Sequence, residues 1–253
     1  MTSNLKKYIL LIALICAIPS ISFAADLRLN YVRQKLVSAG FKVATVNKLL
    51  TDKRIKQYTL KTVAYKEPDW KIIENKLYSD VSVQKGKDYI KQNQTAFDQA
   101  EKNFGVKKEV LAGIIAIETD FGRNTGGYPV FNAIYSRVEK WPVTKWRAQA
   151  DELVAFSKFC LNSKLDCLNI KGSYAGAFGI VQFMPSSVLA YGVDGNNDGV
   201  VDLMNPEDAV PSAAKFLKGH GWDKDQLTAI ARYYGSPIGY PSIVLTYASL
   251  LAK

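Results

Sequence analysis

The chain has 253 residues, of which 48% are hydrophobic and 22% are charged, and 33 Lys and Arg against 23 Asp and Glu give a net charge of +10. This length and composition exclude a disordered chain and allow a sizeable hydrophobic core. The single histidine, His220, almost excludes a multi-histidine metal site or a histidine-based catalytic triad.

The first 24 residues have the pattern of a secretory signal peptide. Two lysines precede an apolar run over residues 8–18, and a small-residue cleavage site ends at Ala24. The run is shorter than the roughly 20 residues of a membrane-spanning helix. Bulky Ile15 directly before Cys16 fits a lipoprotein signal poorly. We therefore expect cleavage after Ala24, a periplasmic protein and no lipid anchor.

The positive charge persists after the predicted cleavage. The 33 basic side chains fall to 31 while 23 acidic ones remain, a net charge of +8. A basic exported protein suits a polyanionic partner, and cell-wall glycan with its lactyl and peptide carboxylates qualifies. Because the sequence has no signature of a nucleic-acid-binding fold, we expect no nucleic-acid partner.

Cys160 and Cys167 are the two cysteines left after cleavage. In an oxidising compartment we expect them to form a local disulfide. The alternative is a pair of reduced thiols that pack as small apolar groups.

Taken in chain order, the predicted elements are helical. Residues 26–56 have the pattern of two short amphipathic helices, the first ending near Gly40, and residues 58–70 are expected to be extended. A long helix should follow from Val83 to Phe104. These segments make a predicted N-terminal helical region, residues 25–105, and the remaining chain, residues 106–253, is expected to be a second domain.

The next predicted helix carries an acidic residue on its apolar face. Leu111, Ile114, Ile115 and Glu118 recur at helical spacing, so the carboxylate continues the buried stripe. Gly122 is well placed to end the helix, which leaves Glu118 in its last turn.

Two interpretations of Glu118 follow from this pattern. It is either a structural acid, paired for example with Arg123, or a general acid whose pKa is raised by burial so that it keeps a proton near neutral pH. Asp120 is the nearest second carboxylate, but two residues along a helix places it on another side.

Further helices are predicted downstream, one ending near Glu139 and one from Lys145 to Cys160. No stretch alternates strongly enough to require a large sheet, so the predicted fold class is mainly α.

The segment 172–187 is unusually rich in small residues. Its glycines and alanines allow close approach of the backbone, and Ser173, Tyr174 and Gln182 offer hydrogen-bonding groups and aromatic surface suited to sugars. A tight packing contact that requires small residues is the equal alternative.

Several motifs in a fixed order resemble one enzyme family. They are Glu-Thr-x-x-Gly-Arg at 118–123, Ser-Tyr-Ala-Gly-Ala-Phe-Gly at 173–179, Gln-Phe-Met-Pro-Ser-Ser at 182–187 and His-Gly-Trp at 220–222. This chain resembles the B-type lytic murein transglycosylases from about Val83 to the C-terminus. The resemblance implies a lysozyme-like catalytic domain, with an added helical region, that acts on peptidoglycan glycan strands and requires no cofactor for its chemistry.

The resemblance also implies a mechanism. Glu118 would protonate the glycosidic oxygen between N-acetylmuramic acid and N-acetylglucosamine, and would then accept the proton of the muramoyl 6-hydroxyl as a 1,6-anhydro ring closes. Because no water is consumed, one acidic residue suffices, whereas ordinary glycosidases use two. Alternatives are a hydrolytic muramidase and a non-catalytic peptidoglycan-binding module.

Other site residues are implied by the same resemblance. Ser173 and Gln182 match positions near the catalytic acid, and Tyr233 and Tyr240 match tyrosines of a closing motif in which Tyr234 stands where the family has Asn. Arg147 matches a substrate-binding arginine, although a surface ion pair is its more common role. We expect a monomer that is able to bind other proteins of wall remodelling.

A loop beginning at Asp194 has the spacing of an EF-hand. Position 12 is Asn205 and not the usual Glu, so Asp208 would have to complete the site, as a late acid does in the resembling family. Asn205 and Pro206 also read as the cap and first residue of a helix. We expect a structural Ca²⁺ or Na⁺ ion held by Asp194, Asn196, Asp198, the Val200 carbonyl, Asp202 and Asp208.

Overall fold

The computed structural model describes residues 20–58, 68–140, 146–163, 165–235 and 239–253, and most of the predicted signal peptide lies outside them. Within these ranges the chain forms twelve α-helices, one short 3-10 helix and one two-stranded sheet, so the mainly α prediction is confirmed. The elements are α1 (Ser20–Ser38), α2 (Val43–Leu50), α3 (Trp70–Leu77), α4 (Asp80–Gln92), α5 (Gln94–Phe104), α6 (Lys108–Thr119), β1 (Tyr128–Pro129), α7 (Val130–Lys140), α8 (Trp146–Asn162), η1 (Cys167–Asn169), β2 (Lys171–Gly172), α9 (Pro185–Tyr191), α10 (Pro206–Gly219), α11 (Gln226–Tyr234) and α12 (Tyr240–Leu251).

The single helix predicted from Val83 to Phe104 is wrong. The chain instead forms α4 and α5, which meet at Asn93. The Asn93 backbone N–H and the Asn93 side-chain amide both donate hydrogen bonds to the Tyr89 carbonyl oxygen, at 3.1 and 2.9 Å, and so close the last turn of α4. The apolar periodicity runs through the break, which is why it did not reveal the change of direction.

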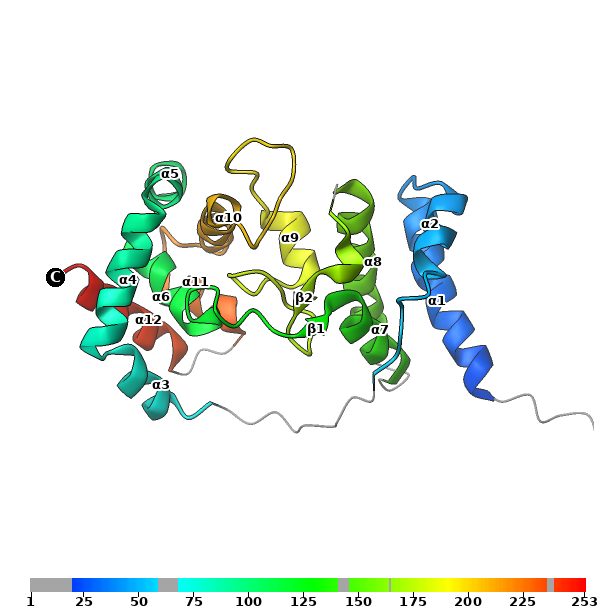
Figure 1. Cartoon of the computed structure of the whole chain (residues 1–253), viewed down its shortest axis with the longest axis horizontal. Coiled ribbons are helices and arrows are strands. Elements are labelled where there is room, and N and C mark those ends of the chain that lie inside the picture. The colour runs from blue at the N-terminus through cyan, green and yellow to red at the C-terminus, as the bar shows by residue number, and fades with distance from the viewer. Residues whose placement is uncertain (1–19, 59–67, 141–145, 164, 236–238) are drawn as a thin grey trace, which may run out of the picture.

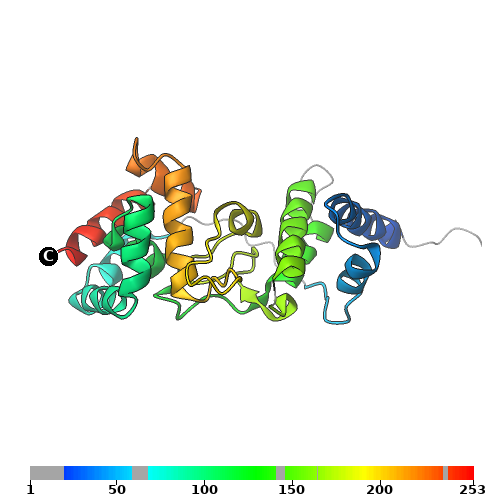
Figure 2. The same cartoon turned by 90° about the horizontal axis from the view of Figure 1, so that it is seen from above.

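The helices gather at two ends of an elongated molecule (Figure 1). At one end, α1 packs with α7 and α8 and also carries α2, and at the other α3, α4 and α5 pack with α6, α10 and α12. Segment 172–184 and α9 lie between these groups in both views (Figures 1 and 2). The segment 25–105 therefore contributes to both ends, and the domain boundary at residue 105 stays a prediction.

Side chains of α1 fix the first end of the molecule. The Arg28 guanidinium donates hydrogen bonds to the carbonyl oxygens of Val138 and Glu139 at the end of α7. Tyr31 packs edge-on against Trp146 at 5.3 Å, and its hydroxyl donates to Asp151 on α8 at 2.8 Å. Since these contacts use polar groups at helix ends and surfaces, they orient α1 against α7 and α8.

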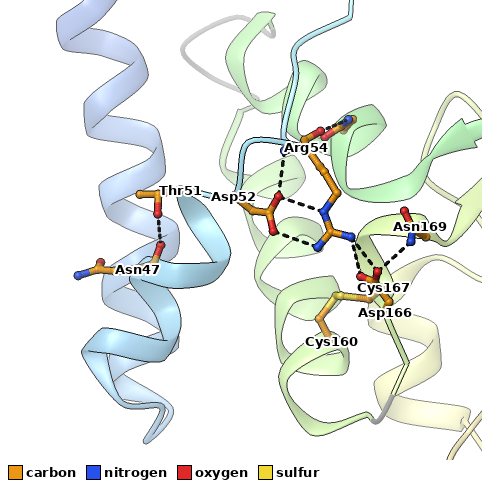
Figure 3. A network of polar contacts seen from close by, with 9 residues as sticks. Asn47, Thr51, Asp52, Arg54, Cys160, Asp166, Cys167 and Asn169 are labelled. Atoms are coloured by element: carbon orange, nitrogen blue, oxygen red, sulfur yellow. Dashed lines mark hydrogen bonds and ion pairs between the residues drawn. A yellow bond between two sulfur atoms is a disulfide. The ribbon is translucent and has the colours of Figure 1, made fainter.

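A second polar network joins the segment after α2 to the disulfide loop (Figure 3). The Arg54 guanidinium pairs with Asp52 at 2.9 Å and with Asp166 at 2.7 Å. Cys160 and Cys167 form a disulfide, which closes the loop that carries Asp166. Arg54 thereby connects two segments more than 100 residues apart in the sequence.

Helix α6 lies in the core of the second end. Every residue from Val110 to Ala116 is buried, and the helix packs mainly against α12, with α4 and α5 alongside. The sequence predicted that Gly122 ends this helix, but this prediction is wrong. The helix ends at Thr119, and Asp120, Phe121 and Gly122 follow with φ values of 52°, 61° and 82°. Three successive left-handed residues turn the chain sharply, at a cost of about 1 kcal/mol or more for each non-glycine residue.

In the described part of the chain the only sheet is the short pair of β1 and β2, which run antiparallel with Tyr128 opposite Gly172. Gly126 precedes β1 at φ 97°, and a Cβ atom there would lie 2.1 Å from the Gly172 carbonyl oxygen. Only glycine allows this approach, which brings the turn after α6 to the small-residue segment. In this part of the chain no helix combines the length and apolarity needed to cross a bilayer.

Candidate active site

Glu118 occupies the last turn of α6, where the helix leaves the core. Its side chain is partly exposed, whereas its neighbour Thr119 is buried. The Thr119 hydroxyl donates to the Ile180 carbonyl oxygen at 2.7 Å and accepts from the Gly122 backbone N–H at 3.0 Å. The helix end that carries Glu118 is therefore fixed to the small-residue segment.

Two tyrosines from the C-terminal helices surround this carboxyl group. The Tyr240 hydroxyl, at the start of α12, donates to Glu118 Oε1 at 2.8 Å. Tyr233 on α11 donates to the Val181 carbonyl oxygen at 2.8 Å, and its burial, together with the Glu118 charge, raises its pKa well above the usual value. Because Tyr240 is fully buried, its pKa also lies well above the usual value, and it remains a hydrogen-bond donor at neutral pH.

The environment of Glu118 favours its protonated form. Burial raises the pKa of Glu118 from 4.5 to about 7, and the hydrogen bond from Tyr240 offsets part of that increase. A carboxyl group with a pKa near 7 is able both to donate and to accept a proton at physiological pH. The arrangement is therefore chemically suited to acid catalysis followed by base catalysis.

Asp120 is directed away from this role. Its carboxylate pairs with Lys85 on α4 at 2.5 Å and lies 3.7 Å from Arg123. Its pKa is lowered by Lys85 against an opposing effect of burial. Because Lys85 on a different helix holds the Asp120 carboxylate ionised, Asp120 serves to fix the turn. Arg123 pairs with Asp120 and not with Glu118.

Segment 172–184 contributes Ser173 and Gln182. The Ser173 hydroxyl accepts from the Ala177 N–H at 3.1 Å and so closes the turn that contains Tyr174, whose side chain is 55% exposed. Gln182 has a left-handed backbone, φ 49°, and its amide donates to the carbonyl oxygens of Thr125 and Gly179. Both polar groups shape the segment, which Thr119 and Tyr233 hold beside Glu118.

The sequence matches the Transglycosylase SLT domain family over residues 24–234. The chain belongs to this family. It is 33% identical over 212 residues to membrane-bound lytic murein transglycosylase B of Escherichia coli strain K12, and the match covers 83% of this chain and 57% of that protein.

Solved structures of relatives share the fold. The soluble lytic transglycosylase SltB1 from Pseudomonas aeruginosa superposes with a TM-score of 0.78 at 25% identity, covering 89% of this chain and 98% of that one. The Escherichia coli lytic transglycosylase Slt35 in complex with calcium superposes with a TM-score of 0.77 at 24% identity, covering 89% and 92%. The lysozyme-like fold expected from the resemblance is therefore confirmed.

The sequence did not predict an aromatic cluster that the structure shows in this transglycosylase domain. Tyr234 stacks on Tyr240 with ring centroids 4.8 Å apart, and Trp70 packs edge-on against both rings at 5.4 and 6.2 Å. Trp70 begins α3 directly after Asp69, which caps the helix. The sequence patterns predicted no helix over Trp70–Leu77, because residues 58–70 were expected to be extended and the next helix to begin at Val83. No local signal indicates that this tryptophan reaches a residue 170 positions away.

Arg147 is the predicted substrate-binding residue that the structure places at the other end of the domain. It is exposed near the start of α8, with its guanidinium carbon 5.2 Å from the centroid of the Trp146 ring. That ring also contacts Tyr31 of α1. A role for Arg147 in substrate binding stays a prediction.

The loop at 194–208 of this family member contains oxygen donors that suit a hard cation. In the described residues, however, no three Asp, Glu, His or Cys side chains are grouped closely enough to hold a metal. The Asp194 carboxylate instead accepts the N–H groups of Asp198 and Gly199, and the buried Asp208 accepts those of Gly195 and Asp202. The acids as arranged tie the loop together through the backbone.

The helix that follows the loop begins as expected. The Asn205 side chain caps α10 by accepting the Glu207 N–H at 3.0 Å, and Pro206 is its first residue. Pro211 lies inside α10 and cannot donate to the Glu207 carbonyl. That carbonyl faces Gly195, where a Cβ atom would lie 1.9 Å from it. The loop therefore packs against the proline irregularity of the helix.

Proposed function

We propose that this chain is a lytic transglycosylase that cleaves the β-1,4 bond between N-acetylmuramic acid and N-acetylglucosamine in peptidoglycan. The observation that carries the proposal is Glu118, partly exposed, with a pKa raised to about 7 and Tyr240 bound to one oxygen. Family membership supports the same reaction, since the Escherichia coli relative acts on murein.

The proposed reaction uses the two protonation states of one residue. Protonated Glu118 donates to the glycosidic oxygen as the bond from that oxygen to the muramoyl C1 breaks, and the substrate N-acetyl group stabilises the cationic carbon. The 6-hydroxyl oxygen then bonds to C1, and ionised Glu118 accepts its proton. The products are a free N-acetylglucosamine 4-hydroxyl and a 1,6-anhydro end, and the enzyme returns to its starting state.

The surrounding residues have supporting roles in this proposal. Tyr240 keeps its proton and orients the Glu118 carboxyl group, while Thr119 and Tyr233 fix the adjoining segment. Ser173, Tyr174 and Gln182 lie on that segment, and we assign to it the binding of the N-acetyl sugars. The segment's small residues leave space for the glycan to approach the backbone.

The experiment is a digest of purified peptidoglycan analysed by mass spectrometry. Anhydro products are lighter by one water than hydrolysis products, so the wild-type chain should release only the lighter series. The Glu118→Gln variant is the matched control, because the amide has a similar shape but cannot donate the proton. Heavier products would instead establish a muramidase, and glycan binding without release of products by the wild type would establish a binding module.

We further propose a periplasmic location. The proposal rests on the predicted signal peptide and on the murein substrate of the relative. Fractionation of cells that express the full chain would test it: cleavage after Ala24 and release with the periplasmic contents are expected, whereas retention of an uncleaved chain in the cytoplasm would refute the location.

Calcium binding by the loop at 194–208 is a separate proposal. The spacing of Asp194, Asn196 and Asp198 supports it, as does the relative Slt35 that was crystallised with calcium. Binding would have to replace backbone hydrogen bonds to Asp194 and Asp208 with bonds to the ion. Millimolar Ca²⁺ should raise the thermal midpoint of the wild type but not of Asp194→Asn, and equal midpoints with and without Ca²⁺ would rule the site out.

A further inference from the structure

The start of α12 is covered by a side chain from α3. Tyr240 is the first residue of α12, and Gly239 before it has φ 78°. A Cβ atom at Gly239 would lie 2.7 Å from the Trp70 ring, so only glycine allows the ring to pack on this backbone. Helices α3 and α12 lie side by side (Figure 1). Trp70 therefore contacts the backbone from which Tyr240 projects.

Two aromatic rings also pack against the ring of Tyr240. Tyr234 stacks on it with an angle of 17° between the ring planes, and Trp70 meets it edge-on at 65°. Stacked and edge-to-face arrangements at these separations are the ones that aromatic pairs prefer. Tyr240 is fully buried, whereas Trp70 and Tyr234 are partly exposed. The two partners therefore shield Tyr240 from solvent and restrict the positions that its ring can take.

The position of this ring determines a contact of the candidate catalytic acid. The Tyr240 hydroxyl lies 2.8 Å from Glu118 Oε1. Because a hydrogen bond weakens steeply beyond about 3.2 Å, a displacement of the ring by about 1 Å would remove it. In the described part of the chain, the titratable groups coupled to Glu118 are Tyr233 of α11 and Tyr240 of α12, and Tyr233 donates instead to Val181. The carboxyl group thus depends on Tyr240 for this hydrogen bond.

We propose that Trp70 is a positioning residue, which together with Tyr234 holds the Tyr240 hydroxyl on the Glu118 carboxyl group. The inference rests on the proposed function, in which that carboxyl group donates a proton and then accepts one. Trp70 acts through Tyr240 and not on the substrate. Helix α3 belongs to the predicted N-terminal helical region, so this region contributes a residue that orients the catalytic acid.

The direct test is an NMR titration of the ¹³C-labelled Glu118 carboxyl group, which requires no activity. Burial raises the pKa of Glu118 and the Tyr240 hydrogen bond lowers it, so loss of that bond should raise the pKa further. Trp70→Ala should move the titration midpoint to higher pH by at least about half as much as Tyr240→Phe does. The double variant should titrate as Tyr240→Phe does, because both changes remove the same bond.

Two further variants separate positioning from stability. Trp70→Phe retains a ring for the edge-on contact and should keep the wild-type midpoint. The matched control, Leu77→Ala, removes a buried side chain from the other end of α3, so it should lower the urea midpoint without moving the titration. If Trp70→Ala does not fold, Tyr234→Leu removes the stacked ring and takes the same test. An unchanged or lower titration midpoint, or shifts that add in the double variant, would overturn the inference.

Kinetics on soluble muropeptides separate this inference from the proposed function. Trp70→Ala should lower kcat about tenfold or more with a smaller effect on KM, because it displaces a group that orients the acid. Leu77→Ala should keep the wild-type kcat. A higher KM with unchanged kcat would instead assign Trp70 to substrate binding and overturn the positioning role. If the wild type releases no product, the proposed reaction fails, while the NMR titration still decides whether Trp70 positions Tyr240.

Discussion

Replacing Glu118 by Gln should change stability in a way that depends on pH. The folded pKa of about 7 lies about 2.5 units above the value of 4.5 for an exposed carboxyl group. Each unit corresponds to about 1.36 kcal/mol, so the ionised carboxylate costs the folded state about 3 kcal/mol once the pH exceeds 7.

The sign follows from proton binding. Between pH 4.5 and 7 the folded wild type binds more protons at this site than the unfolded chain does. Its free energy of unfolding therefore falls as the pH rises through that range. Gln has no such titration, so Glu118→Gln should match the wild type near pH 4 and exceed it by about 3 kcal/mol at pH 8.

Urea unfolding at pH 4 and pH 8 measures this difference directly. The matched control is Glu109→Gln, the same substitution in the first turn of the same helix and away from Tyr240. A stability difference between Glu118→Gln and the wild type that changes by less than about 1 kcal/mol between the two pH values would refute the argument that burial raises this pKa.

Three further predictions concern the same residues. Because the proposed reaction begins with protonated Glu118, kcat/KM on soluble muropeptides should fall as the pH rises through about 7, and a rate that is flat to pH 9 would contradict this. Tyr240→Phe removes the hydrogen bond that lowers the Glu118 pKa, so the fall in kcat/KM should move to higher pH; a shift to lower pH would contradict the assigned contact. Thr119→Val leaves the Ile180 carbonyl without its donor and should cost about 1–3 kcal/mol in urea unfolding, whereas an unchanged midpoint would show that this hydrogen bond contributes little.

Local patterns in the sequence predicted much of the fold. The apolar stripe on α6, the Asn205 cap of α10 and the mainly α class all follow from contacts within a few residues. The order of the family motifs indicated the lysozyme-like fold. Such signals fail where two local choices compete, as at Asn93, where helical periodicity continues through a break.

The candidate site was predicted only in part. Glu118 was selected because an acid on an apolar stripe is unusual, and Tyr240 because of its motif. Neither argument could establish that the Tyr240 hydroxyl reaches Glu118 across 122 residues, or that Trp70 packs against Tyr240. The rings of Trp70, Tyr234 and Tyr240 lie near the Glu118 carboxyl group because the helices that carry them, α3, α11 and α12, pack together with α6.

The sequence by itself determined the mainly α class, the family and the acidic residue around which the proposed chemistry is organised, because each depends on spacing along the chain. The tertiary structure decided the rest. It paired Asp120 with Lys85 on α4, and it placed the Tyr240 hydroxyl of α12 against the Glu118 carboxyl group. Periodicity fixes which face of a helix is buried but not which partner covers it, and the pKa of a carboxyl group depends on that partner.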